Sequence, residues 1–231
     1  MKKIFTYGLS ILLVMILLSC GYGTMLENDN DEVLSYIVSD NTYTFSEIEN
    51  TNVVISYPQV SLNPFENSSN DTAKQINSIL LDTALNNYED TWGIDNLSID
   101  GRYSIVMLSS QTLCVVFQRS AYKLDLPHPT DECFAVTIDL TKGENFNLSN
   151  FITSYDDISP YIIEGNYKVL YGSLKVYEPT EVWQVINEKY CNEPLENHVN
   201  DFYLSNNDLC LIISDLTHGG GDFSVISIPY K

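Results

Sequence analysis

Residues 112–119 (TLCVVFQR) and 132–140 (ECFAVTIDL) carry the pattern that decides the fold. In both stretches bulky apolar side chains alternate with smaller or polar ones, and many of them are β-branched or aromatic. Such alternation predicts strands that turn one face toward a core. If the two strands are antiparallel neighbours with their bulkiest side chains inward, Cys114 and Cys133 share the opposite face.

Further strands and three helices surround this pair. The first helix, 72–89, is predicted by a capping-box spacing at its start and by apolar residues that recur every three or four positions. A second helix is expected over 154–171, although Gly165 weakens its period, and a third over 181–191. The other predicted strands are 42–45, 52–60, 102–108, 202–204, 208–214 and 223–230. Segregated, hairpin-linked elements predict an α+β fold of antiparallel sheets with helices packed on one face, in two subdomains.

The first twenty residues predict where the protein resides. Lys2 and Lys3 precede an uncharged run, 4–19, which ends in Leu17-Leu18-Ser19-Cys20 and resembles the bacterial lipobox. We therefore expect a signal peptide over 1–19, a lipid on Cys20, and an extracytoplasmic protein anchored to the bacterial cell membrane. The alternative is a retained membrane helix, but a run of 16 is shorter than the roughly 20 residues that span a bilayer. Residues 20–41 are expected to form a flexible acidic tether.

The composition is strongly acidic. Eleven Lys and Arg oppose 31 Asp and Glu, for a formal charge of -20. This charge argues against a nucleic-acid partner, because phosphate backbones require a basic surface. It would steer cationic proteins toward the chain, although solubility alone is also a sufficient reason for the acidity.

The four cysteines that remain after Cys20 allow three pairings in an oxidising compartment. The order of the segments favours the disulfides Cys114–Cys133 and Cys191–Cys210, each closing a loop of about 20 residues. Four buried free thiols are the alternative. No C-x-x-C motif occurs, so a structural zinc site or a dithiol redox site is not expected.

Several motifs, taken in order, suggest a family. They are Ile55-Ser56-Tyr57-Pro58-Gln59-Val60 before a helix with Asn77, a β pair ending near His128-Pro129, Val136-Thr137-Ile138-Asp139-Leu140 with Gly143 and Phe146-x-Leu148, Phe202-Tyr203-Leu204-x4-Leu209-Cys210-Leu211, and Ile226-x-Ile228-Pro229-Tyr230. Over roughly 42–231 the chain resembles the extracytoplasmic domain of RsiV-type anti-sigma factors, which is also an accessory domain of PdaC-type peptidoglycan deacetylases.

The resemblance implies a PdaC-like subdomain over 42–130 and an RsiV-like subdomain over 131–231. For the RsiV branch it also implies direct binding of lysozyme. We expect neither a cytoplasmic anti-sigma segment nor a deacetylase domain, because only Met1-Lys2-Lys3 precedes the apolar run and the three histidines do not form the deacetylase metal pattern. No lysozyme-contacting residue can be transferred to this sequence.

No catalytic constellation is evident. His218 lies in an HGGG segment like that of esterases, but no G-x-S-x-G elbow and no later histidine accompany it. His128, His198 and His218 are too scattered to predict a metal site, and no cofactor is expected. Tyrosines at 155, 161, 167, 171 and 177 suit either a sugar-stacking platform or the sides of half-buried helices.

The leading hypothesis is thus a non-enzymatic cell-surface lipoprotein that binds a protein at the cell wall, in particular a basic, lysozyme-like hydrolase. The main alternative is a peptidoglycan- or carbohydrate-binding module, and an uncharacterised hydrolase is the third possibility.

Overall fold

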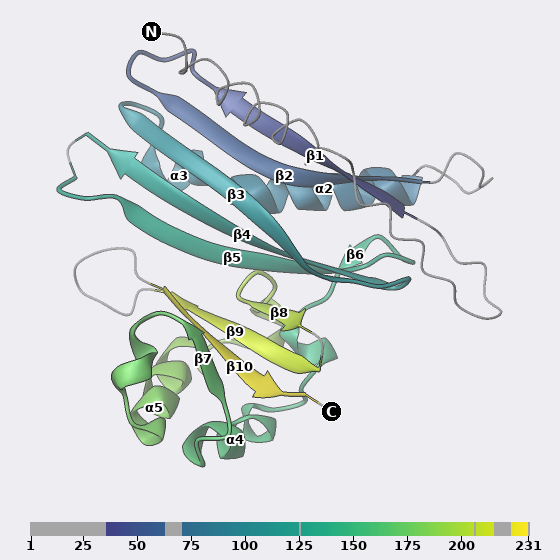
Figure 1. Cartoon of the computed structure of the whole chain (residues 1–231), viewed down its shortest axis with the longest axis vertical. Coiled ribbons are helices and arrows are strands. Elements are labelled where there is room, and N and C mark those ends of the chain that lie inside the picture. The colour runs from purple at the N-terminus through teal and green to yellow at the C-terminus, as the bar shows by residue number, and fades with distance from the viewer. Residues whose placement is uncertain (1–35, 63–70, 125, 206, 215–222, 231) are drawn as a thin grey trace, which may run out of the picture.

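The computed structural model describes residues 36–62, 71–124, 126–205, 207–214 and 223–230, which form two sheets (Figure 1). The six-stranded sheet has the order β1-β2-β3-β4-β5-β6, and the four-stranded sheet has the order β7-β10-β9-β8. The elements of the first part are β1 (Tyr36–Phe45), β2 (Asn52–Leu62), α2 (Asp71–Leu85), α3 (Tyr88–Trp92), β3 (Leu97–Leu108), β4 (Thr112–Lys123), β5 (Thr130–Asp139) and β6 (Glu144–Asn145). The second part contains α4 (Ser159–Ile163), β7 (Lys168–Tyr171), α5 (Pro179–Lys189), β8 (Phe202–Ser205), β9 (Asp208–Ser214) and β10 (Phe223–Pro229), with single 3-10 turns between them.

The predicted α+β class is confirmed, and most strand pairs are antiparallel. The one parallel pair joins β2 to β3, because α2 and α3 carry the chain back along the sheet between them. Among the described elements, a β-α-β unit is therefore present where the sequence predicted antiparallel pairing.

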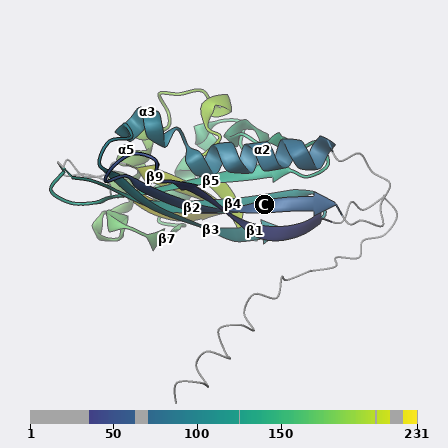
Figure 2. The same ribbon diagram turned by 90° about the horizontal axis from the view of Figure 1, so that it is seen from above.

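The first core lies between the six-stranded sheet and α2, which covers one face of that sheet (Figure 2). Alternating residues of β4 and β5 supply it, among them Leu113, Val115, Phe117, Phe134 and Val136. On the helix, Ile76 and Leu80 are fully buried at a spacing of four, which confirms the predicted amphipathic stripe.

The four-stranded sheet has its own core on the side covered by α4 and α5. Val182 and Ile186 of α5 pack there against Leu209, Leu211 and Ile213 of β9. The other face of this sheet packs against the six-stranded sheet through a third, smaller cluster. The layers thus run helix, sheet, sheet, helices, and each sheet has helices on one face only (Figure 1).

Several predicted boundaries are wrong. Residues 36–41 belong to β1 rather than to a tether, because this edge strand alternates half-buried and exposed residues against β2. The subdomain boundary placed between 130 and 131 would cut off β5, which pairs with β4 in the same sheet. The first sheet instead ends with β6 at Asn145, and the second core begins at Leu148.

The predicted second helix, 154–171, is also wrong. Only the short α4 forms, and Gly165, with φ 75°, lies just beyond its end. The chain then extends into β7, which pairs with β10. The third helix is confirmed as α5, but it begins two residues earlier, with Glu178 as the capping residue and Pro179 in the first turn, and it ends two residues earlier, at Lys189.

Among the described helices, none has the length and apolar character needed to cross a membrane. The predicted signal peptide lies outside the described residues.

Candidate functional site

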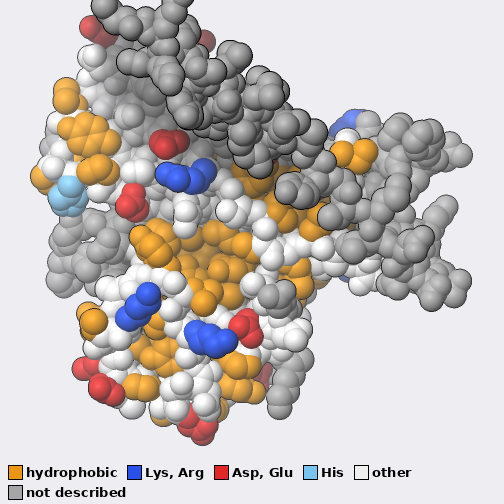
Figure 3. All heavy atoms as spheres, viewed as in Figure 1, with side chains coloured by type: hydrophobic (Ala, Val, Ile, Leu, Met, Phe, Trp, Pro, Cys, Tyr) orange, Lys and Arg blue, Asp and Glu red, His pale blue; other side chains and the backbone are white. Residues whose placement is uncertain are grey.

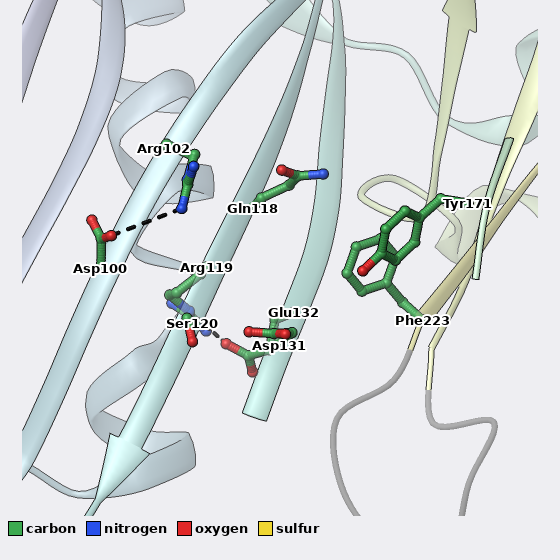
Figure 4. Close-up of a pocket in the computed structure, with 9 residues that line it drawn as sticks. All are labelled: Asp100, Arg102, Gln118, Arg119, Ser120, Asp131, Glu132, Tyr171 and Phe223. Carbon is green, nitrogen blue, oxygen red and sulfur yellow. Dashed lines mark hydrogen bonds and ion pairs between the residues drawn. The ribbon is translucent and has the colours of Figure 1, made fainter. Parts of the chain in front are cut away.

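Two adjoining hollows lie where the two sheets meet. The smaller one, of about 200 Å3, is open between β3, β4 and β5 on one side and β7 and β10 on the other (Figure 4). Tyr171 and Phe223 face it with rings stacked 4.6 Å apart between centroids. Its remaining lining is polar and of both charges: Asp100, Arg102, Gln118, Arg119, Ser120, Asp131 and Glu132. In the space-filling view, apolar side chains form a strip between the sheets, with Lys or Arg side chains above and below it (Figure 3).

The larger hollow is a cleft of about 790 Å3 at the edge of β5, and it shares Asp131 and Glu132 with the smaller one. It combines residues from four distant segments: the end of α2 with α3, the start of β5, the segment that leads into β8, and the end of β9. Its lining is Asn86, Thr91, Trp92, Thr130, Asp131, Glu132, Cys133, Phe134, Asn197, Val199, Asn200, Asp201 and Ser214. All of its charged lining residues are acids.

A buried arginine fixes one wall of the cleft. The side chain of Arg119 is only 1% exposed, and its Nε donates to Glu132 at 2.5 Å. Its Nη1 donates to the carbonyl of Leu85 at 2.7 Å, at the end of α2, where a positive charge also complements the helix dipole. The guanidinium lies 5.2 Å from the centroid of the Phe134 ring. Glu132 is therefore held in place, and its charge is balanced by a neighbour.

Backbone hydrogen bonds fix the opposite wall. The amide of Ala135 in β5 donates to the carbonyl of Asn200 at 2.7 Å, so this segment crosses the open edge of β5. The carbonyl of Asp201 accepts from the amide of Ile212 at 2.7 Å and from the hydroxyl of Tyr190 at 2.9 Å. The two residues are thus positioned by groups from β5, β9 and α5.

Acids dominate the electrostatics of this region. Burial lowers the pKa of His198, but the hydrogen bond at 2.6 Å to Asp201 and the charges of Asp201 and Glu193 outweigh it and raise the pKa. Burial, together with the charges of neighbours that include Asp201, Glu193 and Glu196, raises the pKa of Tyr155 to about 12. Glu193 also accepts from Asn197 Nδ2 at 2.9 Å, which places this carboxylate next to the cleft lining.

The two described histidines lie in different surroundings, and the five clustered tyrosines do not form one exposed platform. His198 is buried, with Nδ1 bound to Asp201 and Nε2 3.3 Å from the carbonyl of Tyr190, whereas His128 is exposed and His218 lies outside the described residues. Of the five clustered tyrosines, 155, 161 and 167 pack against the second core, while 171 and 177 are exposed. In the described part of the chain, no group of three His, Cys, Asp or Glu residues could hold a metal ion.

The favoured disulfide Cys114–Cys133 is wrong. The two cysteines do share the face turned toward the second sheet, as the alternation predicted. In the register, however, Cys114 lies opposite Thr137 and Cys133 lies opposite Gln118. This offset of four residues separates them by about 13 Å along the strands, whereas a disulfide requires α-carbons within about 7 Å.

The second favoured disulfide, Cys191–Cys210, is wrong because the two cysteines lie on opposite sides of the four-stranded sheet. Cys210 is fully buried on the face of β9 that packs against the six-stranded sheet. Cys191 follows α5, which packs against the opposite face of the same sheet. All four described cysteines are free thiols, and Cys20 lies outside the described residues.

Sequence reasoning did not find the residues that line the cleft. Asn86 and Asn87 have positive φ values of 40° and 47°, which ends α2 and turns the chain into α3, where Trp92 lies. Consecutive asparagines between two helical segments are a recognisable signal for such a turn. The segment at Asn200 carries no comparable signal, since packing alone brings it to β5.

No protein-family model and no curated protein matches this chain. The fold is similar to that of a solved DUF3298 family protein from Bacteroides fragilis, with a TM-score of 0.51 and 10% identity over 87% of this chain and 92% of that one. A second DUF3298 family structure, from Pseudomonas aeruginosa PAO1, aligns with a TM-score of 0.49 and 8% identity over 86% and 92% of the two chains. DUF3298 is the domain type associated with RsiV and PdaC, so the fold of the first of these structures agrees with the fold that the sequence resemblance implies. At 10% identity, the likeness establishes the fold.

Proposed function

We propose that this chain is a non-enzymatic cell-surface binding domain that captures a basic protein at the cell wall, in particular a lysozyme-like hydrolase. The observation that carries the proposal is the charge of the larger cleft, whose charged lining residues are Asp131, Glu132 and Asp201. A cleft lined by one sign of charge concentrates the field and attracts ligands of the opposite sign. The net charge of -20 acts in the same direction at longer range.

The proposed location supports such a partner. A lipid on Cys20 would hold the domain outside the membrane, where secreted wall-degrading enzymes act. A non-enzymatic role agrees with the hydrogen bonds of His198. Both of its ring nitrogens already have partners, so neither is free to act as a catalytic base. Glu132 is likewise engaged by Arg119.

The test is binding of the purified chain to immobilised lysozyme as a representative basic protein, at about 0.02 M and about 0.5 M salt. We expect binding at low salt that weakens strongly at high salt. Asp131→Asn should weaken low-salt binding about fivefold, because Asp131 is exposed in the cleft and has no ion-pair partner among the described residues. Glu47→Gln is the matched control, since Glu47 is an exposed acid in the turn after β1, at the far edge of the sheet. Equal losses in both variants would contradict the assignment of the cleft, and an absence of binding at low salt would contradict the function.

A carbohydrate-binding module is the second candidate. The stacked rings of Tyr171 and Phe223 beside the smaller pocket favour it, because aromatic faces with polar groups around them suit sugar rings. Retention on purified wall fragments that is unchanged by salt and lost in Tyr171→Ala would support this reading over the first.

A further inference from the structure

Three polar atoms that belong to lining residues of the larger cleft are buried and have no hydrogen-bond partner within the described protein. They are the indole Nε1 of Trp92, Oδ1 of Asn200 and Oδ1 of Asp201. Buried polar atoms are nearly always paired in folded proteins, so three unpaired atoms at one cleft indicate a place where partners come from outside. One of the three donates a hydrogen bond and the other two accept.

The three atoms belong to both parts of the molecule. Trp92 lies at the end of α3, packed against the first core, while Asn200 and Asp201 lie between α5 and β8. Both sides are held by other contacts, because the carbonyl of Trp92 accepts from Lys123 at 2.6 Å and that of Asn200 accepts from Ala135. The backbone on both sides of the cleft is therefore fixed before any ligand arrives, so that binding has to order only side chains.

The charge of the cleft selects among ligands that could satisfy these atoms. Arg119 balances Glu132, and the second carboxylate oxygen of Asp201 is already hydrogen-bonded to His198. Asp131 remains without a described counter-charge. A neutral sugar would leave that carboxylate uncompensated, whereas a ligand whose donors carry a positive charge compensates it. A lysine ammonium and an arginine guanidinium are donors only and carry that charge.

We propose that the cleft receives a single lysine or arginine side chain of the basic partner. Rotation of the three partly exposed side chains opens Oδ1 of Asn200, Oδ1 of Asp201 and Nε1 of Trp92, which are closed to solvent in the free protein. The charged head then donates to the two Oδ1 atoms beside Asp131, and a main-chain carbonyl of the same peptide accepts from Nε1 of Trp92. This inference rests on the proposed function, because it names the group by which the partner is recognised. It places specificity in the cleft and leaves the long-range attraction to the acidic surface as a whole.

The experiment uses the full chain and two small probes, Nα-acetyl-lysine amide and the same molecule with its ε-amine acetylated. The indole N–H resonances are recorded by NMR during titration, and Trp92→Phe assigns the signal of Trp92 against that of Trp183, the other tryptophan of the chain. We expect the charged probe to shift the Trp92 signal in a saturable way and to leave the Trp183 signal in place. The acetylated probe should bind at least tenfold more weakly.

Two substitutions of Asn200 distinguish a cationic ligand from a neutral one. Asn200→Ala should weaken binding of the charged probe about tenfold, and Asn200→Asp should strengthen it, because a carboxylate replaces a neutral acceptor. Neither change touches the backbone bond between Ala135 and Asn200. Glu47→Gln again serves as the control and should bind the probe like the native chain.

The results distinguish this inference from the proposed function. Equal binding of the two probes, weaker binding in Asn200→Asp, or a shift of Trp92 by a chitin oligosaccharide in place of the charged probe would overturn the inference. If none of these probes shifts Trp92 while lysozyme still binds in an Asp131-dependent way, the inference fails and the function stands. If lysozyme itself does not bind at low salt, the proposed function fails independently of the probes.

Discussion

The ion pair between Arg119 and Glu132 makes the sharpest prediction about stability. The Arg119 side chain is 1% exposed and the Glu132 side chain is 22% exposed, so the two ends of the pair differ in their access to water. Removing one partner of a buried pair typically costs about 3–5 kcal/mol, because the remaining charge is left uncompensated. The cost should therefore depend on which partner is removed.

Glu132→Gln leaves the guanidinium sealed in the protein with the Leu85 carbonyl and the Phe134 ring as its remaining partners. The glutamine oxygen still accepts one hydrogen bond, so we place the loss near the lower end of that range, at about 3 kcal/mol. Arg119→Met removes the sealed charge and keeps an apolar side chain against the ring. Glu132 can then reach water, and we expect a loss of about 1–2 kcal/mol.

The assay is urea unfolding followed by both tryptophan fluorescence and far-UV circular dichroism, whose transitions must coincide for a free energy to be extracted. In the double variant, Glu132→Gln should add little to the loss caused by Arg119→Met. Asp100→Asn is the control, because its pair with Arg102 is 4.0 Å long with both side chains about three-quarters exposed, and it should change stability by less than about 0.5 kcal/mol. A loss in Glu132→Gln no larger than in Arg119→Met would refute the view that Arg119 is the sealed partner.

Two further predictions concern the thiols and a histidine. In the native chain an alkylating reagent should modify Cys191 and spare the three cysteines packed between the sheets. In denaturant the same reagent should modify all four. Peptide mass mapping identifies the modified cysteines, and a disulfide-linked pair would contradict the prediction. The three protected residues are Cys114, Cys133 and Cys210. For His198, whose pKa is raised in the folded state, the stabilisation is complete below the unfolded pKa of about 6.5 and is lost as the pH rises through the folded value. The native chain should therefore lose stability relative to Asp201→Asn as the pH rises above about 6.5, and parallel pH profiles of the two proteins would exclude this coupling.

The parts of the fold that the sequence predicts well are those in which one local period decides the structure. The alternation in β4 and β5 and the three-to-four spacing in α2 each determine a buried face without reference to distant residues. The error over 154–171 arose where the local signal was mixed, since a short helix, a glycine with positive φ and an edge strand follow one another within 13 residues. Pairing with β10 makes β7 a strand, and no period in β7 itself indicates that partner.

The disulfide error has a similar origin. Alternation correctly placed Cys114 and Cys133 on one face, but register is a second and independent quantity. The pair is out of step by four residues because the hairpin begins its pairing at Ala121 and Thr130. Sequence patterns fix which face a residue occupies; the loop between two strands fixes which residue lies opposite.

The lining of the larger cleft could not be predicted from the sequence, because it combines residues from distant segments of the chain. The same origin determines how ligand binding should depend on folding. Trp92 packs against the core of the first part, whereas Asn200 and Asp201 lie in the chain segment that joins α5 to β8 in the second part. The site therefore exists only while the two parts are packed together. A ligand that contacts both parts binds the folded chain and not the unfolded one, and it stabilises the fold by about 2.7 kcal/mol at a concentration of 100 times its Kd. Binding and the packing of the two sheets are thus coupled: a substitution that loosens the cluster around Cys114 and Cys210 should weaken ligand binding without touching the cleft.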